Sequence, residues 1–225
     1  MANLIAIVGS SGAGKSTSIR TLNPKETFII NVASKPLPFK GWRSNYSLWS
    51  KDNPTGNYVN TSDVPTISKI LTYVNTKRPE ITNVIIEDSQ YLMAFEAMDR
   101  AQEKGFQKFT DIAQKFYIIL KNGMSMRDDL NVIVTCHSEN VGTPDEPQLK
   151  IKTLGKMIDN TITVEGLFTY VLFAMIKEGE NGPEYVFQTH SDGTTTAKTP
   201  MDCFEEDYIP NDLQNVIDKI KEYNA

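Results

Sequence analysis

The fold is decided by residues 4–17, Leu4-Ile-Ala-Ile-Val-Gly-Ser-Ser-Gly-Ala-Gly-Lys-Ser-Thr17. The apolar run Leu4–Val8 has the length and β-branching of a buried strand. Gly9 then begins the pattern G-x-x-x-x-G-K-[ST], which cradles nucleotide phosphates. Its glycines let successive backbone N–H groups point inward, and the helix that follows adds partial positive charge.

Each residue of this loop has an expected contact with the nucleotide. Lys15 should reach the β- and γ-phosphates, and the hydroxyl of Ser16 should bind Mg²⁺. The alternative is a Gly/Ser turn with an accidental lysine, and the apolar strand before the loop argues against it. The expected nucleotide-binding residues are Gly9, Ser10, Ser11, Gly12, Ala13, Gly14, Lys15, Ser16 and Thr17.

The composition is that of an ordinary globular protein. The 225 residues are 40% hydrophobic and 23% charged, which fits a single domain over residues 1–225. Every apolar run is far shorter than the roughly 20 residues of a membrane span, so no membrane partner is expected. The two cysteines make no disulfide framework and the two histidines no zinc pattern, so we expect a cytoplasmic location.

The net charge of −5 bears on nucleic acid as a partner. Phosphate contacts dominate nucleic-acid affinity and favour a basic excess, which this chain lacks. A DNA site would therefore be a local patch or would be completed by oligomerisation.

Apolar runs alternate with helical patterns along the chain, which predicts an α/β fold with a mainly parallel sheet between two layers of helices. We expect a C-terminal β-hairpin, and mobile loops at 138–156 and 191–200. Strands are expected at 4–8, 27–32, 83–89, 131–137, 168–176 and 185–189, and helices at 16–22, from the Ser62–Pro65 cap to Lys77, and at 106–126 and 211–223.

The stretch 35–60 differs from the rest because prolines, lysines and aromatic residues are mixed in it. Basic residues among aromatics can bind bases or an adenine ring. The alternative is a hairpin whose aromatic side chains, including Trp42 and Trp49, only cover the edge of the sheet.

Two acidic residues end the strand predicted at 83–89. Ligands collect at the carboxyl ends of parallel strands, and there Asp88 should hold Mg²⁺ through water, opposite the Ser16 hydroxyl. Successive side chains of a strand face opposite ways, so Glu87 should point elsewhere. Glu87 could orient an attacking water, or it could form an ion pair or a cap beneath the sheet.

His137 ends another predicted strand at the same edge. It could sense the γ-phosphate through a hydrogen bond and move the following loop with nucleotide state. The alternative is a purely structural histidine.

Taken together, three motifs resemble those of RecA-like P-loop ATPases, namely Gly9–Thr17, Val84-Ile-Ile-Glu-Asp-Ser89 and Val132-Ile-Val-Thr-Cys-His137. They are most similar to the small single-domain ATPases of bacteriophages called AAA-family ATP-binding proteins, some of which anneal single-stranded DNA in recombination. The resemblance covers roughly residues 3–204 and includes a lysine segment, Thr196–Phe204.

The resemblance implies an Mg-ATP-dependent ATPase in the host cytoplasm that acts in DNA recombination or annealing. It gives Asp88 the Mg²⁺ role and His137 the γ-phosphate sensor role, and it places a mobile DNA-binding loop at 138–156. Lys198 would be a basic finger offered to the nucleotide of a neighbouring subunit in a ring or filament. Lys15, Glu87, His137 and Lys198 are thus the candidate catalytic residues, and single-stranded DNA and phage replication or recombination proteins are candidate partners.

One stretch departs from the family. RecA-like enzymes usually carry a water-activating glutamate just past the second strand, where this chain has Val32-Ala-Ser-Lys35. Hydrolysis would then be slow, use Glu87, or be absent, and a nucleotide-gated binding or loader protein stays open as an alternative. A P-loop kinase is the other alternative, although such kinases bring lid arginines over the phosphates and no arginine follows Arg127 here.

Overall fold

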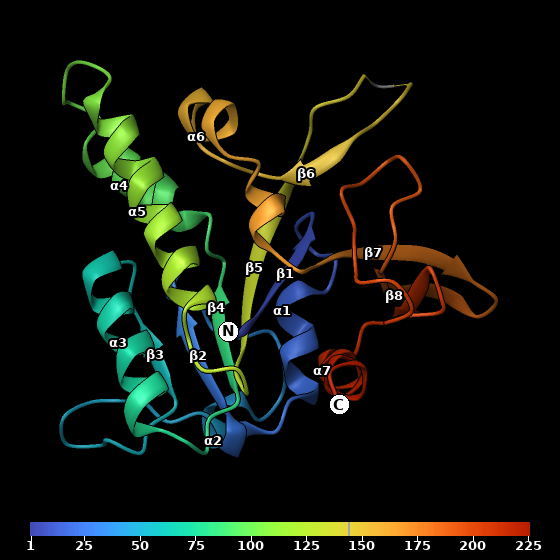
Figure 1. Cartoon of the computed structure of the whole chain (residues 1–225), viewed down its shortest axis with the longest axis horizontal. Helices are drawn as coiled ribbons and strands as arrows, with labels where there is room; N and C mark the ends of the chain where they lie inside the picture. The colour runs from blue at the N-terminus through green and yellow to red at the C-terminus, as the bar shows by residue number, and fades with distance from the viewer. Residues whose placement is uncertain (144) are drawn as a thin grey trace.

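A computed structural model describes residues 1–143 and 145–225 of the chain. Most of the strands form one sheet in the order β3-β2-β4-β5-β1-β7-β8-β9, and β6 pairs with the end of β5 (Figure 1). The strands are β1 Asn3–Gly9, β2 Thr27–Asn31, β3 Tyr58–Asn60, β4 Asn83–Glu87, β5 Asn131–Asn140, β6 Leu149–Ile151, β7 Tyr170–Gly179, β8 Gly182–Gln188 and β9 Tyr208–Pro210.

The pairing confirms the predicted α/β fold with a mainly parallel sheet. β1 runs parallel to both β5 and β7, and β2 runs parallel to both β3 and β4. The register places Gly9 beside His137 and Asn31 beside Glu87, so the carboxyl ends of these strands share one edge. β7 and β8 form the expected antiparallel hairpin.

Helices cover both faces of the sheet. The side chains of α3 and α5 pack on one face, and those of α7 and of the turn after α1 pack on the other. The helices are α1 Lys15–Ser18, α2 Trp42–Asn45, α3 Val64–Lys77, α4 Tyr91–Asp99, α5 Gln107–Met124, α6 Lys156–Thr161 and α7 Leu213–Tyr223, with 3₁₀ turns at Ile19–Thr21, Pro24–Glu26 and Val164–Leu167.

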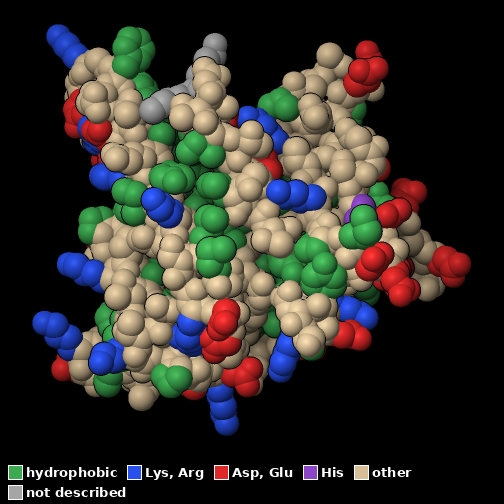
Figure 2. All heavy atoms as spheres, in the orientation of Figure 1, with side chains coloured by type: hydrophobic (Ala, Val, Ile, Leu, Met, Phe, Trp, Pro, Cys, Tyr) green, Lys and Arg blue, Asp and Glu red, His purple; other side chains and the backbone are tan. Residues whose placement is uncertain are grey.

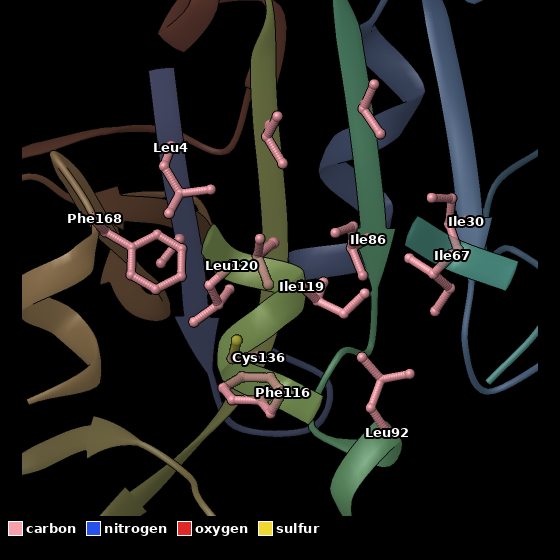
Figure 3. Packing of buried hydrophobic residues seen from close by; sticks show 14 of the residues in the cluster. Leu4, Ile30, Ile67, Ile86, Leu92, Phe116, Ile119, Leu120, Cys136 and Phe168 are labelled. Carbon is pink, nitrogen blue, oxygen red and sulfur yellow. The ribbon is translucent and has the colours of Figure 1, made fainter. Parts of the chain in front are cut away.

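Side-chain alternation along the strands divides the hydrophobic core in two. In β1, Leu4 faces the layer of α3 and α5, where it joins Phe116 and Leu120 (Figure 3). Ile5 and Ile7 of the same strand face the layer of α7. A strand buried on both faces needs apolar residues at every position, which is why β1 reads as a continuous apolar run.

Helix ends follow the sequence signals closely at α3 and α7. The carboxylates of Asp63 and Asp212 accept hydrogen bonds from the backbone N–H groups of Thr66 and Asn215, respectively, and so cap the two helices. The helix expected at 16–22 is shorter: α1 ends at Ser18 and continues as a 3₁₀ turn. The amphipathic pattern of α5 was also predicted correctly.

The structure corrects the expectation for residues 35–60. This stretch forms the short helix α2 and the parallel edge strand β3 rather than a hairpin. Its tryptophans pack on neighbouring aromatic rings: Trp42 lies 5.5 Å from Tyr58 and Trp49 lies 5.3 Å from Tyr73, measured between ring centroids.

The two stretches expected to be mobile loops contain backbone pairing. β5 continues to Asn140 and pairs antiparallel with β6, so residues 138–156 include a strand extension. In 191–200, the backbones of Lys198 and Val171 exchange two hydrogen bonds of 2.8 and 3.0 Å. Within the described residues, no helix combines the length and the apolar character needed to cross a membrane.

Candidate nucleotide-binding site

The phosphate loop lies at the carboxyl end of β1 and turns through glycine conformations. Gly14, which precedes α1, has a φ of +94°, in the left-handed region that favours glycine. At Gly9, a Cβ atom would lie 2.5 Å from the carbonyl oxygen of Ala174 on β7, so only glycine fits there. These constraints explain two of the glycines of the motif.

Lys15 is buried at the mouth of this loop, where it is 5% exposed. Its Nζ donates to the carbonyl oxygens of Gly9 at 2.9 Å and Ser10 at 2.8 Å. Burial lowers the pKa of Lys15, while the charges of Asp88 and Glu87 oppose that shift. The loop therefore holds a desolvated ammonium group whose hydrogen bonds a phosphate could replace.

Glu87 faces the Ser16 hydroxyl, so the expectation that the Glu87 side chain points elsewhere was wrong. Ser16 Oγ donates a hydrogen bond to Glu87 Oε1, and Thr135 Oγ1 donates to Glu87 Oε2 at 2.7 Å. Glu87 continues the regular alternation of β4, so its side chain points toward the phosphate loop. The expectation assumed that Asp88 faces the phosphate loop, which would turn Glu87, its neighbour in the strand, to the opposite face.

Asp88 leaves the strand, since its φ of +57° lies in the left-handed region. Its backbone N–H donates to Thr135 Oγ1 at 2.7 Å, and its buried carboxylate forms an ion pair with Lys35 Nζ. His137 Nε2 lies 3.9 Å from Asp88 Oδ1. Left-handed backbone at a residue other than glycine is costly and is concentrated at functional sites.

The two carboxylates differ in their surroundings. Glu87 is fully buried, and burial together with the neighbouring charge of Asp88 raises its pKa, against the hydrogen bonds from Ser16 and Thr135. Partial burial disfavours the Lys35 cation, but the hydrogen bond and charge of Asp88 outweigh this and raise the pKa of Lys35.

His137 stands between the carboxylates and a second small cavity. Its ring packs edge-on against Tyr91, with 6.2 Å between the centroids, and its backbone N–H donates to Gln90 Oε1 at 3.3 Å. Burial and the charge of Lys15 lower its pKa, which favours the neutral imidazole. A neutral ring can donate one hydrogen bond and accept another.

Lys15, Ser16, Lys35, Asp88 and His137 line one cavity of about 560 Å³, and Glu87 contacts Ser16 without lining the cavity itself. Three residues of the phosphate loop do not line this cavity. Ala13 lies in the hydrophobic core, and the carbonyl oxygens of Gly9 and Ser10 accept hydrogen bonds from Lys15. The cavity is lined by Ser11, Gly12, Gly14, Lys15, Ser16, Thr17, Arg20, Lys35, Pro36, Pro38, Asp88, His137, Tyr185 and Asn211.

Several residues in or beside this cavity were not identified from the sequence motifs. Thr135 was detectable, because it is a polar residue in a buried run and lies two positions before His137, on the same face of β5. Tyr185 and Asn211 come from the C-terminal part of the chain and carry no local motif. They lie over the phosphate loop, where a Cβ on Gly14 would approach Tyr185 Cδ1 at 3.0 Å and Asn211 Nδ2 at 3.1 Å.

Three residues singled out in the sequence lie elsewhere. Lys198 is exposed on the segment that pairs with β7, and it does not line the cavity of the described residues. Trp42 and Trp49 also lie outside that lining and pack on their own sheet edge and on α3. An adenine contact by either tryptophan finds no support in this arrangement.

Comparisons with known proteins give little beyond this geometry. No family model and no curated protein matches the chain. Among solved structures, a KaiC-like protein from the hyperthermophilic archaeon Pyrococcus horikoshii OT3 is similar, with a TM-score of 0.46 and 11% sequence identity over 82% of this chain and 76% of that one. A likeness at this level does not indicate an activity.

Proposed function

We propose that the protein binds Mg-ATP in the 560 Å³ cavity and hydrolyses it as a RecA-like P-loop ATPase. The observation that carries the proposal is the contact of Ser16 with the buried carboxylate of Glu87, beside the ammonium of Lys15. A hydroxyl and a lysine of a glycine-rich loop, with a carboxylate from the end of a neighbouring strand, are the groups that bind a metal-bound triphosphate.

The residues present fit Mg²⁺. Ser16 and Glu87 supply the hard oxygen ligands that this ion prefers. The described residues contain no cluster of three or more His, Cys, Asp and Glu side chains suited to a metal. That fits an ion held by one or two protein groups together with phosphates and water. When bound, Mg²⁺ neutralises charge that develops on the phosphate oxygens.

The neighbouring side chains take the remaining roles in this proposal. Asp88, which carries a buried carboxylate at the cavity wall, accepts a hydrogen bond from the attacking water and orients it. His137 forms a hydrogen bond to the γ-phosphate, so that the β5–β6 segment after it (residues 138–143 and 145–151) moves with nucleotide state. These assignments exchange the roles of Glu87 and Asp88 expected from sequence.

We also propose single-stranded DNA as the partner that the β5–β6 segment contacts. Lys152 follows β6 and lines a cavity of about 280 Å³ together with His137 and Tyr91, so a phosphate bound there would touch the sensor side chain. Lys and Arg side chains of the described residues are scattered over the face in Figure 2, and acidic ones gather near the β7–β8 hairpin. DNA binding in recombination or annealing would therefore draw on an assembly of several copies, with Lys198 reaching a neighbouring nucleotide.

A second candidate function is a nucleotide-gated binding protein without useful turnover. The Lys35–Asp88 ion pair favours it, because the ammonium group of Lys35 occupies the carboxylate that would otherwise contact the attacking water. Both functions need the same nucleotide site and differ in turnover.

The test is ATP affinity and phosphate release, measured with and without a single-stranded oligonucleotide. Lys15→Ala removes the buried ammonium, so we expect ATP affinity to fall by at least tenfold and phosphate release to vanish. Lys40→Ala is the matched control, because Lys40 is an exposed lysine outside the cavity lining.

The outcomes separate the candidates. Turnover stimulated by the oligonucleotide supports the DNA-dependent ATPase, and ATP binding without turnover supports the gated protein. Turnover that requires a small-molecule acceptor would indicate a kinase. Unchanged ATP affinity in Lys15→Ala would contradict a nucleotide site at this loop.

A further inference from the structure

Lys35 has a hydrogen-bonded backbone and a half-exposed side chain. Its carbonyl oxygen accepts a hydrogen bond of 2.7 Å from Nδ2 of the buried Asn31, which also donates to Tyr58 Oη at 2.5 Å. Ser34, just before it, has a φ of +55°. The side chain of Lys35 is 49% exposed, so a firmly placed Cα carries a long cation at the wall of the cavity.

The acid that this cation contacts is almost completely buried. The carboxylate of Asp88 is 1% exposed and follows the fully buried Glu87. Two adjacent buried carboxylates repel each other unless a cation or hydrogen bonds compensate them. Ser16 and Thr135 donate to Glu87, Lys15 donates to backbone carbonyls, and Lys35 supplies the ammonium that contacts Asp88.

A bound triphosphate would change this balance. Lys35, Asp88, Lys15 and Ser16 line the same cavity, so a phosphate held by Lys15 enters the surroundings of Lys35. A terminal phosphate carries more negative charge than a carboxylate and accepts charge-assisted hydrogen bonds from ammonium groups. Because Lys35 is half exposed, it can turn from one acceptor to the other without unfolding its loop.

We propose that Lys35 is a γ-phosphate-reading residue, which pairs with Asp88 in the nucleotide-free protein and moves to the third phosphate of a bound nucleoside triphosphate. The move leaves the Asp88 carboxylate free to accept a hydrogen bond from water. Binding of the third phosphate by Lys35 is thereby coupled to loss of the ion pair between Lys35 and Asp88. This inference rests on the proposed nucleotide site.

The test compares a triphosphate with a diphosphate in a calorimetric titration with Mg²⁺. For Lys35→Gln, we expect the affinity for a non-hydrolysable ATP analogue to fall by about tenfold, the size of a lost charge-assisted hydrogen bond, and the affinity for ADP to change less than about twofold. Lys35→Arg should restore most of the triphosphate affinity, because it keeps the charge. Lys40→Gln, a change at an exposed lysine of the same segment, should leave both affinities as they are.

A double variant guards against misfolding. Lys35→Gln leaves Asp88 buried without its cation, which could destabilise the fold. The double variant Lys35→Gln/Asp88→Asn removes both charges together. Relative to Asp88→Asn alone, the double variant should lose about tenfold in affinity for the ATP analogue and less than about twofold for ADP, as Lys35→Gln does relative to wild type. Equal loss for ADP and the analogue, or no loss for the analogue, would overturn the inference while the nucleotide site stands. A wild-type protein that binds neither ligand would overturn the nucleotide site and this inference with it.

Discussion

Two neighbouring carboxylates, Glu87 and Asp88, occupy different surroundings, and the backbone leaves strand geometry between them. Glu87 keeps strand geometry and meets Ser16, whereas Asp88 adopts a φ of +57° and meets Lys35. Thr135 links the two, since its hydroxyl donates to the Glu87 carboxylate and accepts from the Asp88 N–H. Thr135 therefore joins Glu87, the acid that we propose to bind Mg²⁺, to Asp88, the acid that we propose to orient water.

Isosteric amides should separate the two roles. Glu87→Gln removes the charge opposite Ser16, so we expect the Mg²⁺ concentration for half-maximal ATP binding to rise by about tenfold, as for a lost charge-assisted contact. Asp88→Asn should leave Mg-ATP affinity within about threefold of wild type, or make it tighter, and reduce phosphate release by about 100-fold or more. Mg²⁺ titrations and single-turnover assays measure the two effects, and the opposite pattern would restore the roles expected from sequence.

At the scale of helices and strands, most of the sheet but only part of the candidate site could be predicted from the sequence. Buried parallel strands are continuous apolar runs, so β1, β2, β4 and β5 were all identified, and the glycine pattern located the phosphate loop. The short elements α2, β3 and β9 have too few residues for any periodicity to show. Lys35 and Asn211 enter the cavity through tertiary folding, which no local pattern encodes.

The close packing of α5 on the sheet predicts that a large side chain at Gly123 destabilises the protein. Gly123 lies where the helix packs tightly on the sheet: a Cβ there would be 3.1 Å from Val132 Cγ1 and 3.3 Å from Leu4 Cδ1. Gly123→Leu adds four carbons at this contact, so we expect it to destabilise the protein by about 3 kcal/mol and lower Tm by roughly 6–12 °C.

The control for this change is a leucine on the solvent side of the same helix. Gln114 is exposed on α5, and Gln114→Leu should change the free energy of unfolding by less than about 0.5 kcal/mol. Thermal unfolding followed by circular dichroism measures both variants. Equal stability of Gly123→Leu and wild type would show that α5 can move away from the sheet without cost.

At the scale of the whole molecule, the sheet joins two hydrophobic cores that share strands. β1 sends Leu4 to the core under α5 and Ile5 to the core under α7, so both cores depend on the same strand. Each core holds one free cysteine: Cys136 lies in the first and Cys203 in the second. The two thiols are therefore internal probes of whether the cores unfold together.

We expect both thiols to become reactive at the same urea concentration. Burial raises the pKa of Cys136 to about 12 and also raises that of Cys203, so neither forms much thiolate in the folded protein at neutral pH. In native buffer, labelling by iodoacetamide should be slower than in the unfolded chain by about 1,000-fold or more. The variants Cys136→Ser and Cys203→Ser assign each signal, and the midpoints should coincide with loss of the circular dichroism of the helices. If Cys203 reacted at clearly lower urea than Cys136, the core under α7 would unfold as a separate unit, and the single-domain organisation expected from the sequence would be wrong.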